Sequence, residues 1–92
     1  MSKKTFDSVW DAIEDTAGDA ANMRVRADLM IALRELVEQK GWTQAEAARR
    51  CGITQPRIND LLRGRISKFS LDALVNMAAA VGLRVALHLE AA

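Results

Sequence analysis

The residues best suited to chemistry in this sequence are cations gathered between positions 49 and 68. Six lysines or arginines stand there against Asp60 alone, so this segment carries a net charge of +5, although the whole chain of 92 residues carries only +1. The first 22 residues carry −3. A local basic patch attracts phosphate whatever the total charge of the chain, so a nucleic acid is one partner that this asymmetry favours. An ordinary solvated surface carries similar charges, and the patch therefore needs a second signal.

Catalytic chemistry is not expected from this composition. The sequence contains one histidine, one cysteine and no tyrosine, and no glycine-rich phosphate loop accompanies them. Neither a nucleophile–base pair nor a nucleotide cradle is assembled from such a set. His88 has no companion ligands for a metal, and Cys51 suits the role of a small buried hydrophobe. We expect a protein that is not an enzyme and that holds no cofactor and no metal.

The length and composition predict a single globular domain. Half of the residues are hydrophobic and only one is proline, which is typical of a helical protein with one modest core. No apolar run is long enough to cross a bilayer, and the first residues lead into no signal-peptide core. A lone cysteine fits a reducing compartment. The expected location is the cytoplasm, without a membrane partner.

The elements that must position the basic patch follow from apolar spacing. Apolar residues at helical intervals predict helices at about Asp7–Thr16 and Ala20–Lys40, and Gly18 is expected to end or interrupt the first. Gly41 is the expected left-handed cap of the second helix. The buried stripe of that helix is expected to comprise Val25, Leu29, Leu33, Leu36 and Val37.

Capping residues predict three more helices. Thr43 and Glu46 form a capping box, in which the hydroxyl accepts from the Glu46 amide and the carboxylate reaches back to the Thr43 amide. Thr54 opens a second short helix, to about Leu62, with proline in its first turn. Ser70 caps a third helix, Leu71–Val81.

The spacing between the first two of these helices predicts a helix-turn-helix at about Thr43–Arg63. Ala48 is small where two helices must approach, and Gly52 follows where a sharp turn favours positive φ. Ile58 and Leu61 then face inward on the second helix, which leaves its outer face available to enter a groove of DNA. Together with the basic residues around it, this set points to duplex DNA as the partner.

The last segment changes period. Leu83, Val85, Leu87 and Leu89 alternate with polar or small residues, which predicts a β-strand. A lone strand leaves its backbone groups unpaired, and no second strong strand is present. Its partner could be the same strand of a second subunit, residues near Thr5 in its own chain, or a strand of another protein.

The stretch TQAEAARRCGITQPRINDLLRGRISKFSLDALVNMAAAVG resembles the Cro/repressor-type (XRE) helix-turn-helix domain. The longer span Ala27–Leu89, with LRGRISKFSLDAL and the closing LRVALHL, is similar to the HigA-like antitoxin branch of that family. The resemblance implies an all-α, five-helix bundle, here with a C-terminal β-strand, that binds a palindromic operator as a homodimer. It also implies a transcriptional repressor that neutralises a small toxin and represses the operon they share. Alternatives are a stand-alone or phage-type regulator, or a protein-interaction module that binds no DNA.

The resemblance also implies a DNA-contacting set, in which Gln44 touches a phosphate at the start of the first motif helix. Gln55 and Arg57 suit base edges, because glutamine can bind adenine and arginine can bind guanine. Pro56 offers only an apolar contact, and Asp60 needs a cytosine amine or a nearby arginine. The remaining expected contacts are Thr54 and Asn59 on the second motif helix, and Arg63, Arg65, Ser67 and Lys68 in the phosphate-gripping loop after it.

The chain is expected to divide into three parts. Residues 1–22 form an acidic amphipathic segment and residues 23–82 the DNA-binding domain. Residues 83–92 form the strand and tail, whose Leu83, Val85, Leu87 and Leu89 are the expected dimerisation residues.

Overall fold

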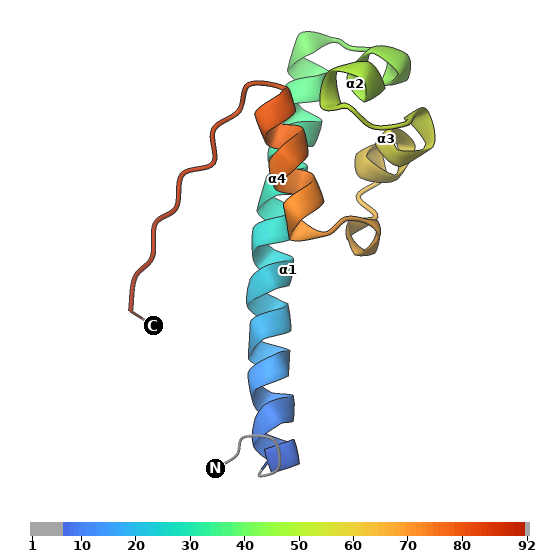
Figure 1. Ribbon diagram of the computed structural model, residues 1–92. Coiled ribbons are helices and arrows are strands. Elements are labelled where there is room, and N and C mark those ends of the chain that lie inside the picture. Colours follow the sequence, from blue (N-terminus) through green and yellow to red (C-terminus); the bar gives the residue numbers. More distant parts are fainter. Residues whose placement is uncertain (1–6, 92) are drawn as a thin grey trace.

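The computed structural model describes residues 7–91, with side chains described from residue 17 onward. It contains four α-helices and one short 3₁₀ turn in this range (Figure 1). In chain order these are α1 (Asp7–Lys40), α2 (Gln44–Cys51), α3 (Gln55–Leu62), η1 (Ile66–Lys68) and α4 (Leu71–Ala80).

The first helix is longer than the sequence predicted. Residues 7–40 form one continuous helix of 34 residues, so the expected break at Gly18 is wrong and the expected five helices are four. A glycine inside a helix costs only about 1 kcal/mol relative to alanine, and the alanines that follow Gly18 are strong helix formers. Within residues 7–91, no helix is both long and apolar enough to span a bilayer.

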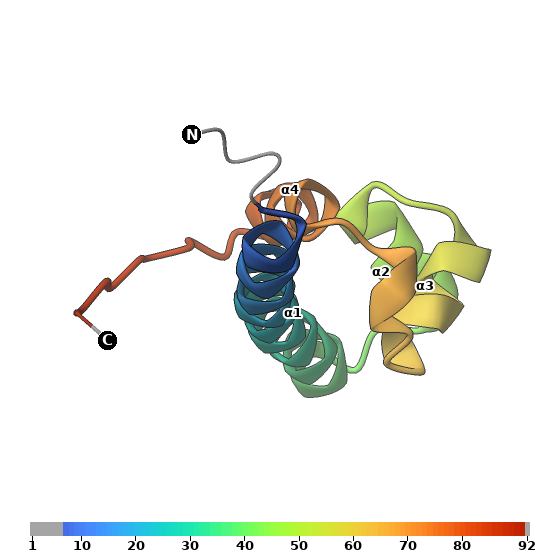
Figure 2. The ribbon, with the colours of Figure 1, turned by 90° about the horizontal axis from the view of Figure 1, so that it is seen from below.

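The helices pack in two groups on the C-terminal half of α1. Helix α4 lies along α1, and α2 and α3 pack together on one side of the α1–α4 pair, as Figures 1 and 2 show from two directions. Helix α1 is about 50 Å long and α4 about 15 Å, from their residue numbers and the helical rise. The N-terminal half of α1 therefore projects beyond the bundle (Figure 1).

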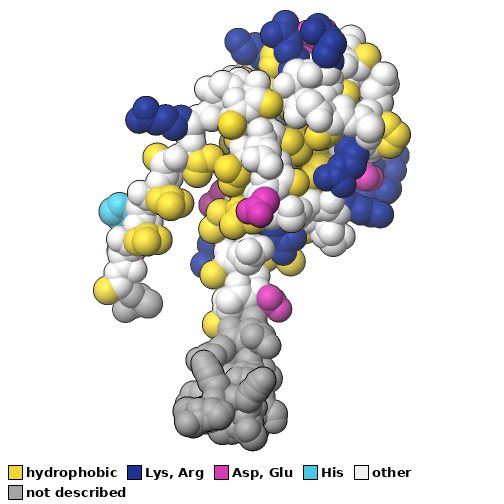
Figure 3. Space-filling view, in the orientation of Figure 1, with side chains coloured by type: hydrophobic (Ala, Val, Ile, Leu, Met, Phe, Trp, Pro, Cys, Tyr) yellow, Lys and Arg dark blue, Asp and Glu magenta, His cyan; other side chains and the backbone are white. Residues whose placement is uncertain are grey.

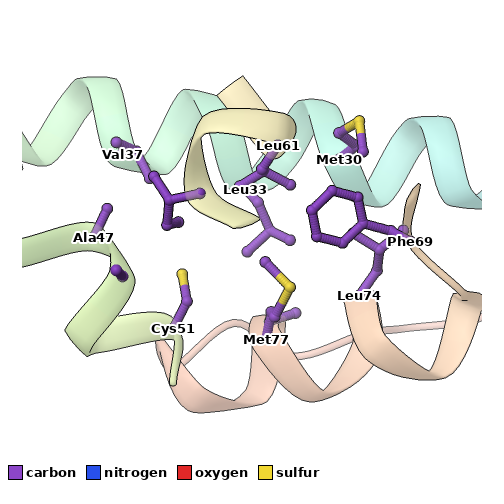
Figure 4. Close-up of a cluster of buried hydrophobic side chains, with 12 residues drawn as sticks. Met30, Leu33, Val37, Ala47, Cys51, Leu61, Phe69, Leu74 and Met77 are labelled. Carbon is purple, nitrogen blue, oxygen red and sulfur yellow. The ribbon is translucent and has the colours of Figure 1, made fainter. Parts of the chain in front are cut away.

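One hydrophobic core joins all four helices (Figure 4). Its largest side chains, each at most 1% exposed, are Leu33, Ile58, Leu61, Phe69 and Leu74. The predicted stripe of α1 is confirmed at Leu33 and Val37 and extends to Met30, whereas Val25 is 42% exposed. Val25 lies nearer the projecting end of α1, and this explains its exposure.

The C-terminal segment is extended but is not a strand within the described residues. The Leu83 amide donates to the Ala78 carbonyl at 2.9 Å, and residues 84–91 make no backbone hydrogen bond in the described part of the chain. A strand is defined by its pairing, and a single copy of the chain offers this segment no partner. The structure therefore confirms the all-α fold class, and within the described residues it contains no C-terminal strand. We call residues 84–91 the tail; it stands away from the helices in Figures 1 and 2.

Candidate nucleic-acid interface

The turn between α2 and α3 has the geometry that the sequence predicted. Gly52 has φ 74°, in the left-handed region, and its amide donates to the carbonyls of Ala48 and Arg49. The buried Ala48 and Cys51 bring α2 close to its neighbours. Burial raises the pKa of the Cys51 thiol, so this side chain is an inert part of the core, as expected.

Helix α3 begins at a side-chain cap and turns two apolar residues into the core. The Thr54 hydroxyl accepts from the Arg57 amide at 3.4 Å, and Pro56 lies in the first turn. Ile58 and Leu61 have no solvent exposure. The opposite face carries Gln55 and Pro56, both exposed, and Asn59 and Asp60, both half-buried. A helix presented in this way has a free face for a DNA groove.

Helix α2 carries a paired set of charges that lies away from this face. The Thr43 hydroxyl accepts from the Glu46 amide at 3.1 Å, which confirms half of the predicted capping box. The Glu46 carboxylate, however, accepts from Arg49 and from Arg50 Nε, the latter at 2.6 Å, and not from the Thr43 amide. Hydrogen bonds from Arg50 and Arg49 lower the pKa of Glu46. The Arg50 guanidinium also stacks over Trp42, 5.3 Å from the ring centroid.

The charge count from sequence overstated the free positive charge because it began after Glu46. That carboxylate lies against two of the six cations counted. In Figure 3, one group of Lys and Arg side chains lies over α2 and a second lies beside the segment that follows α3, while others lie on the tail and along α1. The second group is therefore the stronger candidate for phosphate contact.

Asp60 on α3 has a nearby arginine, Arg65, as one of the two expected alternatives. Its carboxylate accepts from Arg65 Nη1 at 3.3 Å. The Arg65 cation offsets the negative charge of Asp60, which would otherwise repel phosphate. Arg63, Ser67 and Lys68 remain as exposed polar groups of the same loop.

Arg57 makes contacts that the sequence did not predict. Its Nη1 donates to the Lys68 carbonyl at 3.1 Å, and its guanidinium stacks over the buried Phe69, 4.5 Å from the ring centroid. Arg57 thus links α3 to the loop. Contact between Arg57 and a base edge stays a prediction. Such a contact would use the guanidinium N–H groups that do not bond Lys68, or it would require another rotamer of this side chain.

A second arginine holds the same loop from the opposite side. Arg26 on α1 donates through Nη1 to the carbonyls of Ile66 and Phe69, both at 3.2 Å, while its Nε donates to Asn22 at 2.6 Å. Sequence reasoning missed Arg26, because its partners lie 40 and 43 positions away. Without these donors, the carbonyls of Lys68 and Phe69 would depend on water, whereas the Ile66 carbonyl also accepts from the Phe69 amide at 3.1 Å.

The structure brings most of the predicted DNA-contacting residues onto α3 and the loop after it. Thr54, Gln55 and Pro56 are exposed at the start of α3, and Arg63, Arg65, Ser67 and Lys68 are exposed after its end. Gln44 is exposed at the start of α2. Helices α2 and α3 pack directly against each other, so these groups share one region of the molecule.

Comparison with known proteins agrees with this geometry. The family described as "Helix-turn-helix domain" matches residues 12–90 of the chain. A solved structure, named provisionally as an XRE-family transcriptional regulator, is similar with a TM-score of 0.73 and 27% sequence identity; the match covers 80% of this chain and 83% of the other. No curated protein matches the chain.

Proposed function

Because this chain belongs to the helix-turn-helix domain family, we propose that it binds duplex DNA through α3 and regulates transcription as a non-enzymatic regulator of the XRE type. The observation that carries the proposal is the free polar face of α3 beside an exposed basic loop. The similarity to the XRE-family regulator supports it. A helix of this kind reads bases in the major groove, while the cations around it hold the phosphates.

Gln55 is the strongest candidate for direct base reading. It is exposed on the first turn of α3, and a glutamine amide can bind adenine through two hydrogen bonds. Asn59, one turn later, has the same chemistry. Pro56 offers an apolar surface to a thymine methyl group. Thr54 and Gln44 lie at helix N-termini, which favour contact with phosphate oxygens.

The loop after α3 supplies the sequence-independent part of the binding. Arg63 and Lys68 are exposed and Arg65 retains donors beyond its bond to Asp60. Each phosphate contact releases counterions, so binding should weaken steeply with salt.

The salt dependence of binding tests the proposal. Fluorescence anisotropy with labelled random duplex DNA should show binding that collapses at moderate salt. The triple variant Arg63→Ala, Arg65→Ala, Lys68→Ala should bind more weakly and lower the slope of log K against log[salt] by about three units. The variant Arg24→Glu, which reverses the charge of an exposed arginine on α1, serves as the control. Binding that ignores salt, or an unchanged slope in the triple variant, would contradict the proposed interface.

The finer proposal is that the protein is a dimeric repressor and the antitoxin of a toxin–antitoxin module in the cytoplasm. The resemblance over Ala27–Leu89 supports it, and so does the N-terminal half of α1, which projects from the bundle within an acidic part of the sequence (Figure 1). Such a helix suits a small basic protein partner. A stand-alone or phage-type regulator would share the DNA interface without the partner.

Co-expression with the product of a neighbouring small gene tests this finer proposal. The antitoxin model requires a complex that survives gel filtration and loses stability when residues 1–22 are removed, while DNA binding by the bundle persists. A protein-interaction module without DNA binding would give the complex but fail the salt-dependence test above.

A further inference from the structure

The tail combines apolar side chains with backbone groups that lack partners. Val85, Leu87 and Leu89 are 41%, 78% and 87% exposed. Beyond the Leu83 amide, no backbone group of residues 84–91 forms a hydrogen bond within the described part of the chain. An extended segment in this state is a template for pairing with another strand.

The side chains of the tail separate into two faces. Because successive residues of an extended chain point to opposite sides, Val85, Leu87 and Leu89 share one face, and Arg84, Ala86, His88 and Glu90 share the other. The 4.0 Å approach of His88 Nε2 to Glu90 Oε2, two positions apart, agrees with this alternation. The tail is thus apolar on one side and charged on the other.

We propose that two copies of this chain pair their tails as antiparallel strands, with the two-fold axis at Leu87. Leu87 then lies opposite Leu87 of the partner subunit, and Val85 lies opposite Leu89 of the partner subunit. On the other face, Arg84 lies opposite Glu90 of the partner subunit, and symmetry provides this oppositely charged pair twice. Directly opposed pairs of these kinds stabilise antiparallel strands.

The alternation and the charges select this register over its neighbours. An axis midway between two residues would place apolar side chains opposite polar ones, because a slip of one residue exchanges the faces. An axis at Ala86 keeps the faces but sets Arg84 opposite His88 of the partner subunit and Glu90 opposite Gly82 of the partner subunit, so no oppositely charged pair forms. An axis at His88 sets Glu90 opposite Ala86 of the partner subunit, so Glu90 has no cation opposite it.

The helices provide a surface for the apolar face of such a ribbon. A groove of about 410 Å³ lies between the tail and the bundle, and its helical wall includes Val25, Leu29, Ala32 and Ala78. Hydrophobic side chains line the tail and the helix surface that faces it in Figure 3. A paired ribbon that settles into this groove would cover Val25 together with the exposed side chains of the tail. A second copy is the occupant that the self-complementary register favours.

Disulfide trapping tests the register directly. The single variants Leu87→Cys, Val85→Cys and Leu89→Cys change exposed side chains, and the wild-type chain is the control because its Cys51 is buried. In a glutathione buffer, Leu87→Cys should form a symmetric cross-linked dimer, since cysteines that lie directly opposite meet the distance requirement. Val85→Cys alone should not form a cross-linked dimer. With the axis at Leu87, the two copies of position 85 are separated by four residues along the ribbon, or about 13 Å. A mixture of Val85→Cys and Leu89→Cys should cross-link as the heterodimer.

Charge exchange supplies an independent measurement. Arg84→Glu and Glu90→Arg should each raise the dimer dissociation constant, measured by analytical ultracentrifugation at low salt, by about tenfold, because each variant opposes like charges twice. The double variant should restore the wild-type value.

Preferential trapping at Val85 or Leu89 alone would overturn the register. A chain that stays monomeric at all concentrations, or that stays dimeric without residues 84–92, would overturn the interface and favour a strand of another protein or the chain's own N-terminus as the partner. The proposed pairing of the tails does not depend on DNA binding. A protein that binds DNA as a monomer would therefore contradict this dimer but not the proposed role as a transcriptional regulator.

Discussion

The loop after α3 and the tail after α4 both leave the regular helices, yet their backbones are bound very differently. In the loop, the carbonyls of Ile66, Lys68 and Phe69 accept from arginines on α1 and α3. In the tail, residues 84–91 have no backbone hydrogen bond within the described part of the chain. A segment outside the α-helices is thus fixed when other elements of the same chain supply partners for its carbonyls. Within the described residues, the single copy supplies no such partner to the tail.

A matched pair of leucines gives the largest contrast between the bundle and the tail. Leu61→Ala should lower the free energy of unfolding by about 2–5 kcal/mol, because Leu61 has no solvent exposure and its removal leaves a cavity. Leu87→Ala removes the same atoms from a side chain that is 78% exposed. In dilute protein its effect should stay within about 0.5 kcal/mol.

Urea unfolding at low and high protein concentration separates the two effects. Leu61→Ala should destabilise the protein at both concentrations. Leu87→Ala should reduce only the gain in stability that higher concentration brings, because dimerisation contributes that gain by mass action. Equal losses for the two variants in dilute protein would show that the tail belongs to the folded core.

Arg26 tests whether the loop must be held in place for DNA binding. Arg26→Met keeps much of the aliphatic stem but removes the donors to Ile66 and Phe69. Binding to any duplex DNA should weaken by about 1.5–3 kcal/mol, a usual range for a hydrogen bond from a charged group. Arg24→Met removes the same charge from an exposed position of the same helix and serves as the control.

A double-mutant cycle distinguishes positioning from direct phosphate contact. If Arg26 acts through the loop, Arg26→Met should add almost nothing once Arg63, Arg65 and Lys68 are alanine. Fully additive losses would instead place Arg26 itself against the DNA. Circular dichroism should show that Arg26→Met and the triple alanine variant both remain helical.

The smallest expected effect concerns Glu46 on α2. Its pKa is lowered by hydrogen bonds from Arg50 and Arg49, so its ionised form is favoured by folding. That contribution is fully present above the ordinary glutamate pKa of 4.5 and is lost as the pH falls through the lower pKa of the folded state. Glu46→Gln should therefore unfold slightly more easily than the wild type at neutral pH.

The difference between Glu46→Gln and the wild type should vanish at strongly acidic pH in thermal unfolding curves. The same variant should bind random DNA slightly more tightly at neutral pH, because Arg49 and Arg50 lose their anionic neighbour. A stability difference that grows on acidification would contradict the assigned cause.

Local signals explain why the sequence predicted some elements well. Thr54 and Ser70 act within three positions of their partners, and Gly52 forms its turn with residues at most four positions away. The prediction failed where partners are distant or competing. The Glu46 carboxylate bonds two arginines instead of the Thr43 amide. Gly18 lies inside one continuous helix, because helical residues flank it on both sides.

The candidate site shows the same division. The spacing of α3 predicted which residues face outward, including Gln55, because that depends on one helix alone. The roles of Arg57 and Arg26 depend on loop carbonyls that only the folded chain brings near, at separations of 11 to 43 positions. Periodicity contains no signal for such contacts.

Whether α3 reads the DNA sequence is tested by comparing Gln55→Ala with the wild-type protein on two DNAs. One is an operator selected from random duplexes by the wild-type protein, and the other is unselected duplex of the same length. Because Gln55 is exposed on α3 and suited to adenine, its loss should weaken operator binding by about 1–3 kcal/mol and leave random DNA almost unaffected. Equal weakening on both DNAs, or no change on either, would contradict the proposal that α3 reads the sequence.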